Sequence, residues 1–141
     1  TEQDKLIFSF CQPKRILDLM FNYIVYDDGV KKITRYQQYF GIKNTLARLN
    51  TKTNNKYTGG VIWHTQGSGK SLTMVMLAQL IAAHPNIKNP KIILVTDRID
   101  LDSQITETFQ KCQFPVENAE VGASKEIIKK ILQKIRNLKK N

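Results

Sequence analysis

The chain has 141 residues, of which 41% are hydrophobic, and a formal net charge of +10. This length is typical of about one globular domain, and no apolar run approaches the ~20 residues that a membrane-spanning helix needs, which argues against a membrane role. The basic balance favours a polyanionic partner such as nucleic acid, although a lysine-rich helix face can also be merely solvated.

The two cysteines, Cys11 and Cys112, are too few for a disulfide framework. We expect them to be free thiols in a reducing compartment. The sequence has no initiator Met and stops on a basic run, so we expect it to be a piece of a larger protein.

The first fifty residues are predicted to be helical. Pro13 suits a first helical turn, and apolar residues from Ile16 to Ile24 recur at helical spacing. Asp27-Asp28-Gly29 is predicted to stop this helix with a turn. A second helix is predicted over 35–49, followed by a polar surface loop over 50–58.

The middle of the chain alternates between short apolar runs and helical patterns. Residues 60–64 and 92–96 are predicted to be buried strands. Residues 69–83 are apolar on nearly every face and predict a buried helix, and another helix is predicted over 101–110. The order strand, helix, strand, helix favours an α/β fold with a parallel sheet.

The end of the chain carries most of the positive charge. Residues 123–141 contain seven Lys or Arg and one acid, which gives +6, whereas the other residues contribute 15 minus 11, or +4. A weak strand is predicted over 116–121, and an amphipathic helix over 124–140 with its lysines facing outward.

Residues 64–71, His-Thr-Gln-Gly-Ser-Gly-Lys-Ser, form a phosphate-binding loop of the helicase type. His64 replaces the first glycine of the general Gly-x-x-x-x-Gly-Lys-Ser/Thr pattern. Gly67 and Gly69 allow the backbone to approach a phosphate closely, and the next helix directs its N-terminus at the anion. Lys70 is predicted to reach the β- and γ-phosphates, and Ser71 to hold Mg²⁺. The predicted nucleotide site also includes Thr65, Gln66, Ser68 and Leu72.

Arg35-Tyr36-Gln37-Gln38 precedes this loop by about thirty residues. A glutamine amide has a donor and an acceptor, so it can pair with the N6 and N7 groups of adenine and reject guanine. The Arg-x-x-Gln spacing predicts that Arg35 and Gln38 bind the base end of the nucleotide, with Gln37 as the alternative. Taken without the loop, the same spacing fits a solvated helix face.

The segment that follows the second apolar run is predicted to face nucleic acid. Thr96 and Arg98 can contact DNA phosphates, and Asp100 and Asp102 also fit the first turn of a helix. Asp97 follows Lys70 too closely for a Walker B site, and no Glu follows it. Because the sequence has no Asp-Glu-x-His box and no nuclease pattern, we expect the chain alone to hydrolyse nucleotide poorly.

Together these motifs resemble the restriction (motor) subunit of type I restriction–modification enzymes. The resemblance rests on Arg35–Phe40, Trp63–Met74 and Val95–Gln104 and covers residues 8–132. It implies a P-loop NTPase of helicase superfamily 2 with a RecA-like motor lobe and a parallel sheet. Residues 1–50 would be a helical lead-in that carries the adenine-reading motif, and 51–141 the first part of the ATP-binding lobe.

The resemblance also implies a function and partners. The subunit would be cytoplasmic and would use ATP and Mg²⁺ to translocate duplex DNA before cutting it, together with modification and specificity subunits. The match carries over Lys70 as the catalytic phosphate contact, Ser71 as the Mg²⁺ ligand and Gln38 as the adenine contact. It carries over no nuclease residue, because no matching segment is present.

Three other functions compete with this one. Another helicase-like ATPase, for example a repair or remodelling motor, would share the loop. A kinase for a small molecule or nucleotide would explain Lys70 and Ser71 but neither Gln38 nor Arg98. A basic nucleic-acid-binding module centred on 124–140 would leave the loop unexplained.

Overall fold

The structure is a computed structural model that describes residues 1–53, 56–57, 59–116 and 133. In chain order its elements are α1 (Glu2–Phe10), α2 (Pro13–Asn22), β1 (Ile24–Asp27), β2 (Val30–Ile33), α3 (Tyr36–Leu49), β3 (Lys52–Thr53), β4 (Lys56–Tyr57), α4 (Lys70–Ala82) and α5 (Ile99–Lys111). Apart from Val116 and Gln133, the predicted strand at 116–121 and the predicted helix at 124–140 lie outside the described residues.

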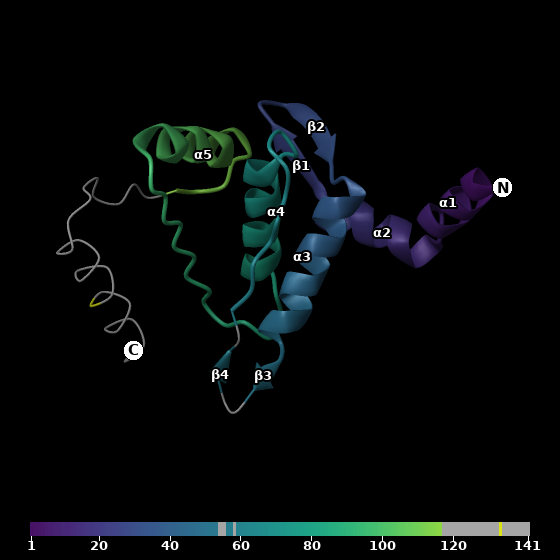
Figure 1. Cartoon of the computed structure of the whole chain (residues 1–141), viewed down its shortest axis with the longest axis horizontal. Coiled ribbons are helices and arrows are strands. Elements are labelled where there is room, and N and C mark those ends of the chain that lie inside the picture. The colour runs from purple at the N-terminus through teal and green to yellow at the C-terminus, as the bar shows by residue number, and fades with distance from the viewer. Residues whose placement is uncertain (54–55, 58, 117–132, 134–141) are drawn as a thin grey trace.

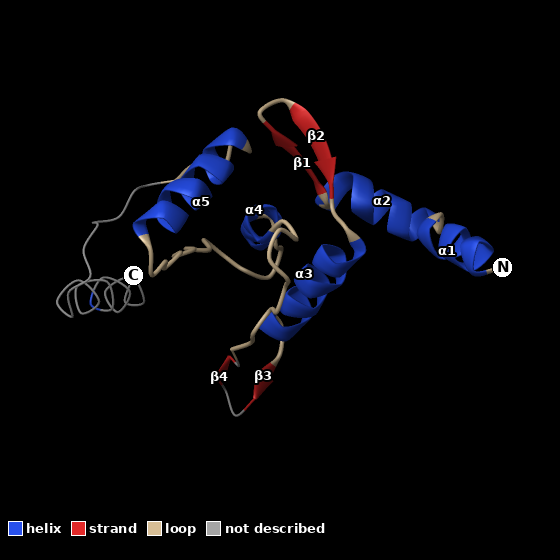
Figure 2. Cartoon of the chain, turned by 45° about the horizontal axis from the view of Figure 1, so that its top comes forward, coloured by secondary structure: helices blue, strands red, loops and turns tan. Residues whose placement is uncertain are grey.

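Three helices form the centre of the molecule, with α4 packed between α3 and α5 (Figure 1). Figure 2 shows α4 nearly end-on between the other two. Each helix contributes fully buried apolar side chains to one core, among them Ile42, Val75 and Phe109. From residue 71 to residue 81 no side chain of α4 is exposed, which confirms the prediction of a buried helix over 69–83.

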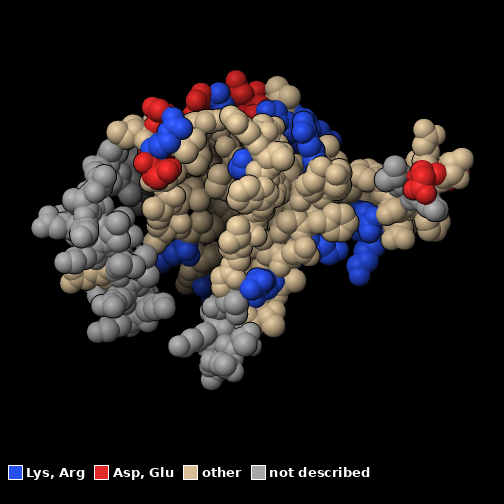
Figure 3. Space-filling model, in the orientation of Figure 1, with Lys and Arg blue, Asp and Glu red and all other residues tan. Residues whose placement is uncertain are grey.

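The helices predicted over 35–49 and 101–110 are confirmed as α3 and α5, with ends that differ by at most two residues. The first turn of α5 carries Asp100 and Asp102. Negative charge is favourable there because the N-terminus of a helix is the positive end of its dipole. Acidic and basic side chains lie together over the hairpin and α5 on the face shown in Figure 3.

A β-hairpin replaces the turn expected after the first helix. α2 ends at Asn22, and β1 then pairs with β2 in antiparallel register, with Ile24 opposite Ile33. Asp28 and Gly29 have φ of 52° and 77°, and positive φ at both central residues is what a tight two-residue hairpin turn requires. The predicted extension of the helix to Ile24 is therefore wrong.

Buried and exposed side chains alternate along this segment, which explains why it forms a strand and not the end of a helix. Tyr23 and Val25 are buried, with 3% and 2% of their surface exposed, whereas Tyr26, the residue of β1 that follows Val25, is exposed. This pattern is typical of a strand with one buried face. The backbone N–H of Asp28 donates to the carbonyl oxygen of Lys111 at 3.3 Å, so the hairpin also contacts the end of α5.

The two apolar runs, 60–64 and 92–96, are not the buried strands that were predicted. Neither 60–64 nor 92–96 pairs with another strand in the described part of the chain, and both sheets found there are two-stranded antiparallel hairpins. Val61 and Trp63 are each 89% exposed, and Val95 is 79% exposed. A strand requires a partner for its N–H and C=O groups, so the predicted parallel sheet is not confirmed.

The N-terminal helices α1 and α2 extend away from the three central helices (Figure 1). They expose large apolar side chains, of which Phe8 and Phe21 are 76% and 81% exposed. Among the described residues, no helix has the length and apolar character needed to cross a bilayer.

Candidate functional site

The loop before α4 has the backbone geometry of a phosphate cradle. Gly67 and Gly69 have φ of +74° and +80°, in the left-handed region that glycine adopts without steric cost. The backbone N–H and the hydroxyl of Ser68 both donate to the carbonyl oxygen of Thr65, at 3.4 and 2.7 Å. The loop is therefore a tight turn whose glycines occupy the two positions that need them.

The N-terminus of α4 faces this loop. Gly69 is its N-cap, and within the described residues no side chain caps the first turn, which leaves backbone N–H groups available to an anion. Lys70 opens the helix, and its Nζ donates to the carbonyl oxygen of Thr65 at 3.1 Å. A cation is disfavoured at the positive end of a helix dipole, so an anion bound at the loop would stabilise Lys70 in place.

Gln38 lies beneath the loop and is 4% exposed. Its Oε1 accepts a hydrogen bond from the backbone N–H of Arg35 at 2.8 Å, and its Nε2 donates to the carbonyl oxygens of Ser68 and Gly69 at 3.4 and 3.0 Å. The structure thus brings the Arg-x-x-Gln motif and the phosphate loop together across thirty residues of sequence.

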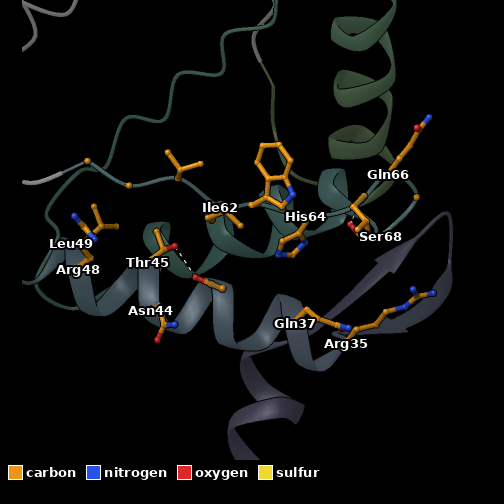
Figure 4. A pocket seen from close by; sticks show the side chains of 17 residues that line it. Arg35, Gln37, Asn44, Thr45, Arg48, Leu49, Ile62, His64, Gln66 and Ser68 are labelled. Atoms are coloured by element: carbon orange, nitrogen blue, oxygen red, sulfur yellow. Dashed lines mark hydrogen bonds between the residues drawn. The ribbon is translucent and has the colours of Figure 1, made fainter.

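A groove of about 850 Å³ runs between α3 and the segment 59–68 (Figure 4). Arg35 and Gln37 line it at the end nearest the loop, and Gln66 of the loop lines it as well. A Cβ on Gly41 would lie 3.5 Å from Nε2 of His64, an ordinary van der Waals contact, so the imidazole lies close to α3 at this point. Of the two glutamines, Gln37 lines the groove and Gln38 does not. The contact of Gln38 with adenine stays a prediction.

The two predicted DNA contacts lie where the chain enters α5. The hydroxyl of Thr96 donates to Oδ1 of Asp102 at 3.5 Å, and Nη2 of Arg98 pairs with Oδ2 of Asp100 at 3.3 Å. Both partners of the second pair are exposed, and such pairs contribute little to stability. The acids of the first turn thus bind the residues predicted to contact DNA, and a phosphate would have to displace them.

Ser71 is the one residue predicted to be a ligand of Mg²⁺. Ser71 is the second residue of α4 and is half-buried. The part of the chain that the structure describes contains no group of three or more His, Cys, Asp or Glu that could hold a metal. Mg²⁺ in phosphate sites usually keeps several waters and takes one or two protein ligands plus phosphate oxygens, so Ser71 fits an ion that arrives with the nucleotide.

Sequence reasoning missed Thr73, which is 4% exposed. Its backbone N–H and its hydroxyl both donate to the carbonyl oxygen of Gly69 at 3.0 Å. A threonine hydroxyl in a helix often bonds the carbonyl four residues earlier. The position of Thr73 four residues after Gly69 could therefore have predicted this hydrogen bond.

Comparison with known proteins points to the same family of proteins as the sequence motifs. A family model described as SWI2/SNF2 ATPase matches residues 37–140. The endonuclease subunit of type I restriction enzyme HindI from Haemophilus influenzae is 38% identical over 115 residues, which cover 77% of this chain and 11% of that protein. A putative type I restriction enzyme MjaIXP endonuclease subunit of Methanocaldococcus jannaschii is 29% identical over 136 residues, or 92% of this chain and 13% of that protein.

The type I restriction enzyme SauCOLORF180P endonuclease subunit of Staphylococcus aureus is 32% identical over 105 residues, which cover 73% of this chain and 11% of that protein. The chain thus spans 11% to 13% of the length of these relatives. No solved structure matches it. These matches confirm the resemblance to restriction subunits that the motifs indicated.

Proposed function

The chain belongs to the SWI2/SNF2 ATPase family, and we propose from this that it is the ATP-binding segment of a type I restriction motor subunit. The observation that carries the proposal is the uncapped N-terminus of α4 behind two glycines with positive φ, with Lys70 beside it. This arrangement suits the phosphates of a nucleotide better than it suits any neutral ligand.

Each loop residue has a role in this proposal. The backbone N–H groups of the loop and of the first turn of α4 cradle the phosphates, and Lys70 exchanges the carbonyl oxygen of Thr65 for a phosphate oxygen. Ser71 contributes its hydroxyl to Mg²⁺, which neutralises charge on the phosphates when bound. Arg35 and Gln38 hold the adenine end. The proposed site is completed by Gln66, Gly67, Ser68, Gly69 and Leu72.

The proposed fold adds a parallel sheet to what the structure describes. We place 60–64 and 92–96 in neighbouring strands of a RecA-like lobe, with 1–50 as the helical lead-in and 51–141 as the first part of the lobe. Exposed apolar side chains on both runs, such as Trp63 and Val95, support this because a buried sheet would cover them.

The proposed activity belongs to the whole subunit. Hydrolysis of ATP drives translocation of duplex DNA before cleavage, in the cytoplasm and together with modification and specificity subunits. Thr96 and Arg98 grip the DNA backbone, a contact that should weaken with salt. The water-activating carboxylate and the nuclease residues are supplied by other parts of the subunit, so this segment alone is expected to be inactive.

Equilibrium binding of ATP to the complete subunit tests the site. Lys70→Ala removes a charge-assisted contact to phosphate, and a loss of about 1.5–3 kcal/mol corresponds to roughly 10- to 100-fold weaker binding. Lys88→Ala, at an exposed lysine after α4, is the matched control and should bind ATP normally. Equal affinity in the two variants would contradict the proposal.

A further inference from the structure

We propose that Gln38 is a positioning residue that holds the phosphate loop in its binding conformation. This role rests on the proposed function, because it assigns a second task to a residue of the same site. It differs from adenine recognition, since it acts on the phosphate end of the ligand and applies to ligands that have no base.

The orientation of the Gln38 amide follows from its neighbours. The backbone N–H of Arg35 is a donor, so the atom that faces it at 2.8 Å must be Oε1. Nε2 then faces the carbonyl oxygens of Ser68 and Gly69, which can only accept. The first turn of α3 therefore fixes the amide, and the amide fixes two consecutive carbonyl groups of the loop.

Gly69 is held from two sides. Its carbonyl oxygen accepts from Nε2 of Gln38 and from both the N–H and the hydroxyl of Thr73, each at 3.0 Å. A Cβ on Gly69 would lie 2.8 Å from Nε2 of Gln38, closer than real contacts allow. The two groups are in direct contact, and that contact sets the direction of the peptide where α4 begins.

This arrangement limits how Gln38 can read a base. Both N–H groups of its amide point at loop carbonyls, whereas adenine N7 needs one of them. The longer bond, to Ser68 at 3.4 Å, is the one that can be released. The bond to Gly69 can persist with or without a base, so its contribution should be shared by every triphosphate.

A loop held in its binding conformation before the ligand arrives loses less freedom on binding. Replacing Gln38 by methionine keeps the length of the side chain and removes all three hydrogen bonds. We expect about tenfold weaker binding, the effect of losing one net hydrogen bond of typical strength. Glutamate should be worse, because a carboxylate oxygen would face two carbonyl oxygens.

The test measures binding of ATP, GTP and inorganic tripolyphosphate, each with Mg²⁺, to the complete subunit. In Gln38→Met all three should weaken by about tenfold, and the KM for ATP should rise while kcat changes little, as expected for an interaction shared by ground and transition states. Gln110→Met, at an exposed position of α5, is the control. The unfolding temperature without ligand reports any general loss of stability.

Wild-type affinity of Gln38→Met for tripolyphosphate would overturn the inference, even if ATP binding fell. Thr73→Val provides a second test should Gln38→Met fold poorly, because it removes one donor to Gly69 and should weaken all three ligands severalfold. If Lys70→Ala weakens binding as predicted while both of these variants bind normally, only the positioning role fails. If wild-type protein binds neither ATP nor tripolyphosphate, the proposed function itself fails.

Discussion

At the scale of single residues, the loop depends on glycine where any other residue would be strained. The backbone of Gly69 has φ of +80°, and its missing side chain leaves room for the amide of Gln38. The left-handed region costs an L-residue roughly 1–2 kcal/mol, and the collision adds to that cost.

Gly69→Ala should therefore distort the loop and weaken ATP binding by the complete subunit at least tenfold. Gly59→Ala is the comparison, because a Cβ there meets nothing within 4 Å and the backbone needs no special conformation. Binding measured by titration calorimetry distinguishes the two. Similar ATP affinity in both variants would show that the loop tolerates a side chain at residue 69.

The sequence was a better guide to which residues form the candidate site than to the contacts that these residues make. Gly67, Gly69 and Lys70 could be assigned because the loop pattern is local and its chemistry depends on the backbone. The contact between Gln38 and the loop joins residues 31 positions apart, and spacing along the chain does not specify such a contact. Gln37 and Gln38 are equivalent in sequence, and only the packing of α3 separates the exposed one from the buried one.

At the scale of elements, α2 and α3 are joined by an aromatic and polar contact. The rings of Tyr23 and Tyr39 lie 4.7 Å apart between centroids. The hydroxyl of Tyr39 donates to Oδ2 of Asp18 at 3.1 Å and accepts from Nζ of Lys43 at 3.1 Å. Burial, with smaller contributions from Asp18 and Tyr39, raises the pKa of Tyr23 from 10.0 to about 12.

This pKa predicts how the junction responds to alkaline pH. Because the folded-state pKa lies above the unfolded value, the neutral phenol stabilises the fold fully below about pH 10, and this stability is lost as pH rises toward 12. Subtracting the phenolate absorbance of Tyr23→Phe from that of wild type should give a titration near pH 12. A midpoint near 10 would mean that Tyr23 is exposed.

Helices were easier to predict than strands for a physical reason. The hydrogen bonds of a helix are local, so the apolar spacing within 35–49 and 69–83 was enough to predict α3 and α4. A strand needs a partner, and composition alone does not say where the partner of 60–64 or 92–96 lies. The β1–β2 hairpin carried a local Asp28-Gly29 signal, but its short strands were outweighed by the apparent helical spacing before them.

At the scale of the whole molecule, the exposed apolar surface is the main feature. Trp63 and Val61 on one extended segment and Val95 on the other are at least 79% exposed. Extended apolar segments with free backbone groups promote association between chains. We expect the 141-residue chain by itself to bind a hydrophobic dye, to be poorly soluble and to melt without a sharp transition. A sharp cooperative melt of a monomer would contradict this expectation.

The central claim is that this chain carries the ATP site of a DNA motor, and hydrolysis by the complete subunit with its partner subunits tests it most directly. The rate of ATP hydrolysis is measured with and without duplex DNA, for wild type and for Lys70→Ala. We expect duplex DNA to raise the wild-type rate and Lys70→Ala to abolish it. Hydrolysis that needs Lys70 but ignores DNA would contradict the motor and favour a kinase-like enzyme instead.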